Sequence, residues 1–273
     1  MITIGQIQYA NCTPIFTALR RGWDCGSYTF EKGVPALLNG KLSRGEIDVC
    51  PASSIEYAKF PDKYLLLPDI SISSDGPVKS VLLFSRFPVE QLCNRSIALT
   101  TESETSVNLL KVVLAKQYNV SNRFERTALP LAEALKKWDA LLLIGDAALR
   151  EEMQSRGDLF IYDLGEMWRG FTGLPFVFAL WMVTREAAEQ KREEVELLSA
   201  RLLAAKLQAY DSYGLIADES EEREWMGRDR LFDYWRSISY DLTPRHLAGA
   251  ATFFKYAKEL QLVAEEPVIR IFS

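Results

Sequence analysis

Short hydroxyl and amide side chains stand where three strand-like segments give way to helical ones, and these side chains could bind an anion. They are Asn11 and Thr13, Ser53 and Ser54, and Thr105 and Ser106. A helix N-terminus presents unpaired N–H groups and a partial positive charge, so it can hold a carboxylate without an arginine. Capping of the helix is the other role open to each residue. Convergence of the three loops on one cleft would make ligand binding as good an explanation as capping.

Other candidates lie beside strongly apolar strands. Ser80 belongs to the apolar segment 78–85 and needs a hydrogen-bond partner if it is buried. Gly145 and Asp146 follow another apolar run, where Asp146 could cap the next helix or take part in chemistry. Gly173 precedes an aromatic stretch that could surround a flat ring or belong to the core. The aromatic residues of this region are Trp168, Phe176, Phe178 and Trp181.

The residue types that are missing restrict the chemistry further. The single histidine, His246, lies in a C-terminal helical segment remote from the strand-end loops, so no Ser/His/Asp or Cys/His set can form around the cleft. The sequence has no P-loop, no G-x-G-x-x-G and no metal-binding cysteine spacing. An enzyme built on these residues needs no metal and no cofactor. It would rely on positioning and electrostatics, as in an elimination that yields a stable product.

The order of the elements predicts an α/β fold with two lobes. Short apolar strands alternate with helical patterns up to about residue 184, which predicts largely parallel sheets, and long helical patterns follow. Two apolar strands, 78–85 and 176–184, bracket a middle section that reads as an inserted domain. This is the topology of a type II periplasmic-binding-protein fold, with ligands bound between the lobes. We predict a first lobe from residues 1–85 and 177–273 and a second from 86–176.

Composition is that of an ordinary globular protein, and it argues against two classes of partner. Of the 273 residues, 48% are hydrophobic and 25% are charged, which is enough to build a core. The formal net charge of -5 argues against nucleic acid as a partner. The N-terminus reads as a strand rather than a signal peptide, and no apolar run is long enough to span a membrane. We therefore expect a cytoplasmic protein.

Six segments, in this order along two-thirds of the chain, resemble the chorismate dehydratases of the futalosine route to menaquinone. They are YANCTPI, LSRGEIDVCPASSIEYA, LLLPDISISSDGPVKSVLLFS, TTESETSVNLL, LLLIGDAAL and YDLGEMWRGFTGLPFVFALW. The resemblance implies loss of water from chorismate, which gives 3-[(1-carboxyvinyl)oxy]benzoate. It also implies that Asn11 and Ser80 carry the reaction. The substrate would be bound by Ser53, Ser54, Thr105, Ser106, Gly145, Asp146 and Gly173.

Two alternatives remain open on the sequence. The sister enzyme of the same pathway makes 1,4-dihydroxy-6-naphthoate on the same fold, but it is expected to use a cleft histidine, and His246 is remote from the motifs. A non-catalytic cytoplasmic sensor of a small carboxylate would show the same cleft. A homodimer is possible, and the sequence does not decide it.

Overall fold

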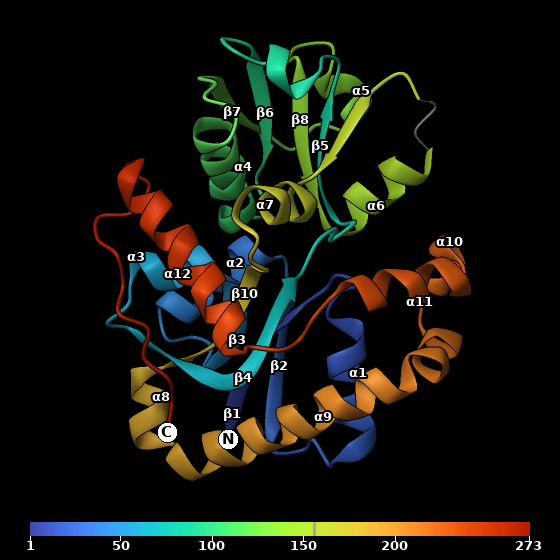
Figure 1. Ribbon diagram of the computed structural model, residues 1–273. Coiled ribbons are helices and arrows are strands. Elements are labelled where there is room, and N and C mark those ends of the chain that lie inside the picture. The colour runs from blue at the N-terminus through green and yellow to red at the C-terminus, as the bar shows by residue number, and fades with distance from the viewer. Residues whose placement is uncertain (155–156) are drawn as a thin grey trace.

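The computed structural model describes residues 1–154 and 157–273, which form two five-stranded sheets (Figure 1). The first sheet has the order β2-β1-β3-β10-β4, from β1 (Ile2–Ile7), β2 (Tyr28–Gly33), β3 (Val49–Ser53), β4 (Tyr64–Ser74) and β10 (Phe176–Thr184). The second has the order β7-β6-β8-β5-β9, from β5 (Val81–Ser85), β6 (Ser96–Thr100), β7 (Arg123–Thr127), β8 (Ala140–Ile144) and β9 (Phe160–Asp163). The predicted two-lobed α/β architecture is thus present.

Twelve α-helices of the described residues surround these sheets. Those of the first two-thirds of the chain are α1 (Thr13–Gly22), α2 (Pro35–Ser43), α3 (Ser54–Lys59), α4 (Glu104–Lys116), α5 (Leu131–Ala134), α6 (Gly145–Gln154) and α7 (Leu164–Thr172). The C-terminal ones are α8 (Arg185–Gln190), α9 (Arg192–Glu219), α10 (Arg223–Met226), α11 (Arg228–Ser237) and α12 (Pro244–Glu259). In Figure 1, α9 runs along the first lobe, α11 lies at the junction of the lobes, and α12 rises beside β10 toward α4.

The strand directions bring the polar loops of both lobes together. In the first sheet β1 runs parallel to β2 and β3, and in the second β6 runs parallel to β7 and β8. The loop after β1 contacts the loops after β6 and β8, because Tyr9 Oη donates to Glu102 Oε2 at 2.7 Å and the Ala10 amide donates to Asp146 Oδ1 at 3.0 Å. The carboxyl ends of parallel strands therefore face each other across the junction, where ligands bind in folds of this type.

Strand β5 lies in the second sheet, whereas we predicted it in the first lobe. The sequence placed the segment 78–85 in the first lobe, but β5 pairs with β8 and β9 of the second sheet. The chain therefore crosses between the lobes before β5, at residues 75–80, and returns before β10. Both β5 and β10 are buried apolar runs, and hydrophobicity alone does not show which of the two sheets each strand will join. Division of the chain into two lobes at 75–80 and 175 is our proposal.

The Ser/Gly/Pro-rich segment 71–77 is partly a strand. Its first half continues β4 to Ser74, because the Ser73 amide donates to the Ser239 carbonyl at 2.8 Å and the Ser239 amide donates back at 2.8 Å. The Ser73 hydroxyl also donates to the Ser239 carbonyl at 3.0 Å. The C-terminal region thus completes the first sheet, and serine hydroxyls are satisfied at this buried edge.

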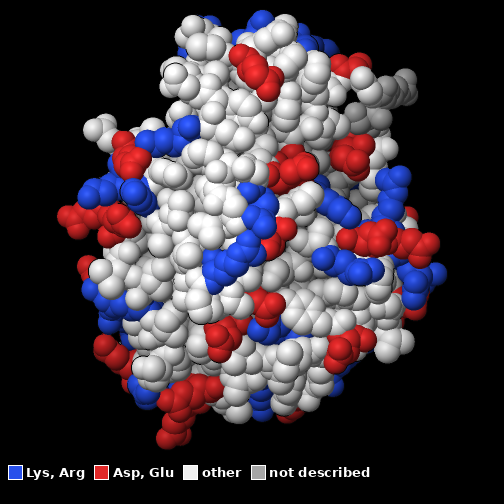
Figure 2. Space-filling view, in the orientation of Figure 1, with Lys and Arg blue, Asp and Glu red and all other residues white. Residues whose placement is uncertain are grey.

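Charges of both signs are interspersed over the face shown in Figure 2, as expected for an ordinary solvated surface. None of the helices among the described residues is both long enough and apolar enough to cross a membrane.

Candidate active site

A cavity of about 50 Å³ lies between the lobes, and it collects five of the nine predicted site residues. These are Asn11, Ser53, Ser80, Ser106 and Gly145. Its other lining residues are Ile7, Tyr9, Pro35, Ile72, Val78, Val81, Ser103, Ile144, Phe178 and Ala179. The lining thus combines hydroxyl and amide groups with apolar side chains and contains no charged residue or histidine. An anionic ligand here would be held by N–H and O–H donors alone.

Helix α4 directs its N-terminus at this cavity. Ser103 caps the helix, because its Oγ accepts from the Ser106 amide at 3.1 Å, and its hydroxyl donates to Ser106 Oγ at 3.1 Å. The free N–H groups of the first turn and the positive end of a 13-residue helix lie beside the lining serines. The sequence placed this cap at Thr105 and Ser106, two residues too late. The neighbouring hydroxyls in S-E-T-S made the true start ambiguous.

Asn11 presents an unused acceptor in the cavity lining. Its Oδ1 is buried and has no hydrogen-bond partner among the described residues. Its backbone is held, since Tyr240 Oη donates to the Asn11 carbonyl at 2.7 Å and Trp235 Nε1 donates to the Ala10 carbonyl at 2.7 Å. A buried polar atom without a partner costs free energy that a ligand would recover. The loop is fixed while the amide group remains available.

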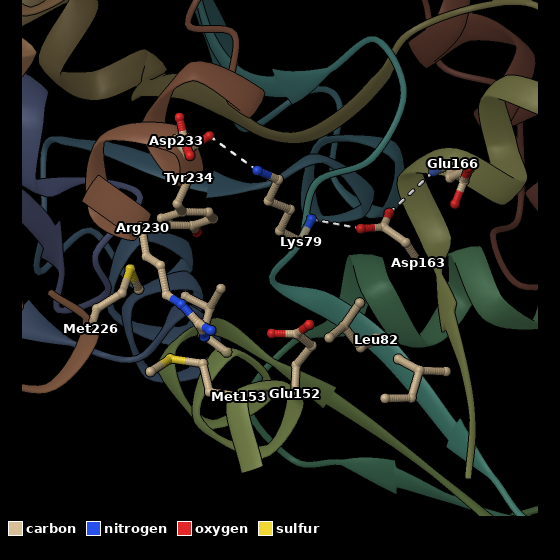
Figure 3. A pocket seen from close by; sticks show the side chains of 12 residues that line it. Lys79, Leu82, Glu152, Met153, Asp163, Glu166, Met226, Arg230, Asp233 and Tyr234 are labelled. Carbon is tan, nitrogen blue, oxygen red and sulfur yellow. Dashed lines mark hydrogen bonds between the residues drawn. The ribbon is translucent and has the colours of Figure 1, made fainter. Parts of the chain in front are cut away.

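Ser80 is held by its backbone and by its side chain. The Gly145 amide donates to the Ser80 carbonyl at 2.8 Å, and Tyr234 Oη donates to Ser80 Oγ at 2.8 Å. The preceding residue, Lys79, has a φ of 63°, which is uncommon for a side chain-bearing residue. The Asp163 carboxylate stabilises this conformation by accepting from the Val78 and Lys79 amides at 3.0 and 2.6 Å, and Figure 3 shows the second of these bonds.

Four predicted site residues lie outside the cavity lining. Thr105 Oγ1 accepts from the Ile55 amide at 3.1 Å and lies 3.4 Å from Ser54 Oγ, so this pair joins α4 to α3 across the lobes. Asp146 also joins the lobes, through the Ala10 amide, and its burial raises the pKa of its carboxyl. Gly173 ends α7 with a φ of 72°. These residues hold the structure in place around the cavity.

We expect Thr105→Val to lower the free energy of unfolding by about 1–2 kcal/mol. Valine keeps the shape but removes the acceptor of the buried Ile55 amide, and an unsatisfied buried donor costs about 1–3 kcal/mol. Urea denaturation measures the change. Thr105→Ser, which keeps the hydroxyl, is the control and should lose less. If the valine variant matched the wild type, this bond would not stabilise the joined lobes.

Tyr9 is a site residue that the sequence did not reveal. Its ring lies against Gly145, where an added Cβ would come within 3.0 Å of the ring, and Gly145 also has a φ of 59°. Burial is the main cause that raises the pKa of Tyr9 well above its usual value, and the hydrogen bond to Glu102 is the second cause. The phenol therefore stays protonated and donates to the Glu102 carboxylate. Gly145 is therefore required both by its backbone conformation and by close contact with the other lobe.

The single histidine serves the C-terminal helix. His246 Nδ1 lies 2.8 Å from Thr243 Oγ1 in a capping box at the start of α12, where Thr243 is the N-cap and Pro244 opens the helix. Of the four aromatic residues named from the sequence, Phe178 lines the cavity, whereas Trp168, Phe176 and Trp181 are buried in the core. Residues 1–154 and 157–273 contain no cluster of three or more His, Cys, Asp or Glu that could hold a metal ion.

Comparison with known proteins identifies the family. A family model described as menaquinone biosynthesis matches residues 2–259. The chain belongs to this family. A chorismate dehydratase of Thermus thermophilus is 37% identical over 212 residues, which are 72% of this chain and 75% of the relative. A chorismate dehydratase of Campylobacter jejuni is 31% identical over 263 residues, 94% of this chain and 98% of the relative.

Solved structures similar to this member of the family confirm the fold class. Protein AF1704 of Archaeoglobus fulgidus has a TM-score of 0.77 at 18% identity and covers 96% of this chain and 98% of its own. The periplasmic aliphatic sulphonate binding protein SsuA of Escherichia coli has a TM-score of 0.68 at 15% identity and covers 100% of this chain and 92% of its own. At these identities the likeness concerns the fold alone, which is that of the periplasmic binding proteins.

Proposed function

We propose that this protein is a chorismate dehydratase, a carbon–oxygen lyase that converts chorismate to 3-[(1-carboxyvinyl)oxy]benzoate and water. The proposal is supported by the two dehydratase relatives and by the menaquinone family to which the chain belongs. The structural observation that carries it is the uncharged cavity, in which the unpartnered Asn11 Oδ1 and the Ser80 hydroxyl lie beside the N-terminus of α4.

The proposed reaction needs little from the protein. A proton leaves the ring carbon that bears the enolpyruvyl ether, the hydroxyl on the neighbouring carbon departs, and the two form water as the ring becomes aromatic. Asn11 is a neutral amide and therefore a poor base, so we assign it the orientation of the substrate. The enolpyruvyl carboxylate of chorismate itself takes the proton and passes it to the departing hydroxyl, which leaves as water, so the carboxylate is regenerated. Holding the reactant in this geometry and stabilising the developing charge supply the acceleration.

The two carboxylates of chorismate suit the donors around the cavity. Ser53, Ser103 and Ser106 place hydroxyls there, and the first turn of α4 adds N–H groups. A charge-assisted hydrogen bond of this kind is worth about 1.5–3 kcal/mol. Because a cavity of about 50 Å³ holds only a few water molecules, the lobes must separate to admit the substrate. The bonds that would break include those of Thr105 and Asp146 and the one between Tyr9 and Glu102.

The decisive experiment is incubation of the purified protein with chorismate in metal-free buffer, followed by ultraviolet absorbance and mass spectrometry. We expect a product that is lighter by one water. Binding of chorismate without turnover would instead identify a sensor. If chorismate is neither bound nor converted, the proposed function is contradicted. The substrate of the sister enzyme would then be tested next. No residue of the cavity lining is a histidine, which disfavours that second substrate.

A further inference from the structure

Helix α11 contributes a fully buried tyrosine that lies outside the cavity lining and contacts the lining residue Ser80. Tyr234 is 1% exposed, and its hydroxyl donates to Ser80 Oγ at 2.8 Å across 154 residues of sequence. The same helix contacts the residue before Ser80, since Lys79 Nζ donates to the Asp233 carbonyl at 3.2 Å (Figure 3). The helix thus contacts the 79–80 segment at two points, one of which is the side chain that we place in the reaction.

The bond has a defined direction. Burial raises the pKa of Tyr234 well above its usual value, so the phenol keeps its proton. Among the described residues Ser80 Oγ is the one hydrogen-bond partner of this hydroxyl, so the phenol donates to it. Ser80 Oγ then accepts, and its own proton must point elsewhere. Among the described residues the alternative acceptor is the Val78 carbonyl at 3.4 Å, which is long for a bond between a hydroxyl and an oxygen. The Ser80 proton is therefore free for a ligand in the cavity.

The backbone around Ser80 is fixed, so the rotation of its side chain is the freedom that remains. Gly145 fixes the Ser80 carbonyl, and Asp163 fixes the two preceding amides. Rotation about χ1 and about the C–O bond would still allow the hydroxyl to turn away from the cavity. A hydrogen bond to Oγ from a rigid, buried phenol removes that freedom.

We propose that Tyr234 is a positioning residue that directs the Ser80 hydroxyl proton into the cavity toward the reacting ring. This inference rests on the proposed function. The Ser80 proton stays on Ser80 throughout, so it stabilises developing negative charge as a hydrogen-bond donor and the reaction stoichiometry is unchanged. Tyr234 acts only through Ser80 and does not touch the substrate.

The test is a double-mutant cycle of Tyr234→Phe and Ser80→Ala, with steady-state kinetics on chorismate. Phenylalanine keeps the buried ring and removes the donor. We expect Tyr234→Phe to lower kcat about tenfold with KM within about twofold, because an undirected hydroxyl weakens the transition state more than binding. In the Ser80→Ala background the same change should have almost no further effect.

Tyr213→Phe is the matched control. Tyr213 on α9 is also buried, and its hydroxyl has no partner among the described residues, so its loss should leave kcat unchanged. The thermal midpoint of each variant shows whether Tyr234→Phe acts through the fold. Equal loss of kcat in both Ser80 backgrounds, or no loss in the single variant, would overturn the inference. If the wild type does not convert chorismate, the proposed function is contradicted together with this inference. If the wild type is active and Tyr234→Phe is unaffected, this inference alone is overturned.

Discussion

Replacement of Asn11 by alanine should lower kcat about 100- to 1,000-fold, the range seen when a preorganised polar group of an active site is removed. Asn11 Oδ1 is buried without a partner among the described residues, so the fold has no structural use for this atom. The amide therefore acts when the substrate is bound, and its loss should change KM much less than kcat. Steady-state kinetics on chorismate measures both constants.

Gln8→Ala is the control for this effect. Gln8 precedes Asn11 on the same loop and carries the same amide group, but it is exposed and lies outside the cavity lining. Its replacement should leave kcat within about twofold. An Asn11→Ala variant with unchanged kcat would remove Asn11 from the mechanism. A rise in KM with kcat intact would reduce its role to ground-state binding.

The sequence predicted the local part of the fold well. Alternation of apolar strands with helices is a short-range pattern, and it located most strands of both sheets and the capped start of α12 at Thr243. Boundaries that depend on distant partners were predicted less well. One of the long helical patterns after residue 184 runs over 186–211 in the sequence, whereas in the structure the helix breaks at Lys191 and α9 continues to Glu219. A second helical pattern, over 219–238, is divided in the structure between the end of α9, α10 and α11.

The cavity illustrates the same division. Asn11, Ser53 and Ser106 were identified because parallel strands bring their carboxyl ends to one edge, a rule that needs no knowledge of distant contacts. Tyr234 and Tyr240 bond Ser80 and Asn11 from more than 150 residues away. A tyrosine in a helix, as Tyr234 is, or in the segment between two helices, as Tyr240 is, carries no local sign of such a role.

Residues with the right chemistry can also be used for another purpose. Substrate binding is predicted for Ser54 and Thr105 from their place at helix N-termini, and for Asp146 from the family resemblance. In the structure, they hydrogen-bond groups of the opposite lobe. A backbone N–H and a hydroxyl satisfy each other as readily as they satisfy a carboxylate, so sequence alone does not separate closure of the lobes from ligand binding.

Replacement of Gly249 by alanine should destabilise the protein by about 2 kcal/mol, opposite in sign to the usual effect of this change in a helix. Alanine is normally better than glycine there by about 1 kcal/mol. In α12, however, an added Cβ would lie 2.1 Å from the Pro175 carbonyl oxygen, a backbone atom that cannot rotate away. Overpacking of this kind costs about 1–3 kcal/mol, and a contact at this distance lies at the upper end of that range. The gain of about 1 kcal/mol in helix propensity offsets part of this cost, which leaves a net loss of about 2 kcal/mol.

Gly170→Ala in α7 is the matched control, because nothing lies within 4 Å of its added Cβ and the site is exposed. It should raise stability by about 0.5–1 kcal/mol. Urea denaturation of both variants measures the difference in sign. Pro175 immediately precedes β10, where the chain returns to the first lobe, and its carbonyl also accepts from Trp168 Nε1 at 3.3 Å. Displacement of α12 would thus disturb the return crossing itself. A Gly249→Ala variant as stable as the wild type would show that α12 can withdraw from Pro175 without loss, so that its close packing does not fix this crossing.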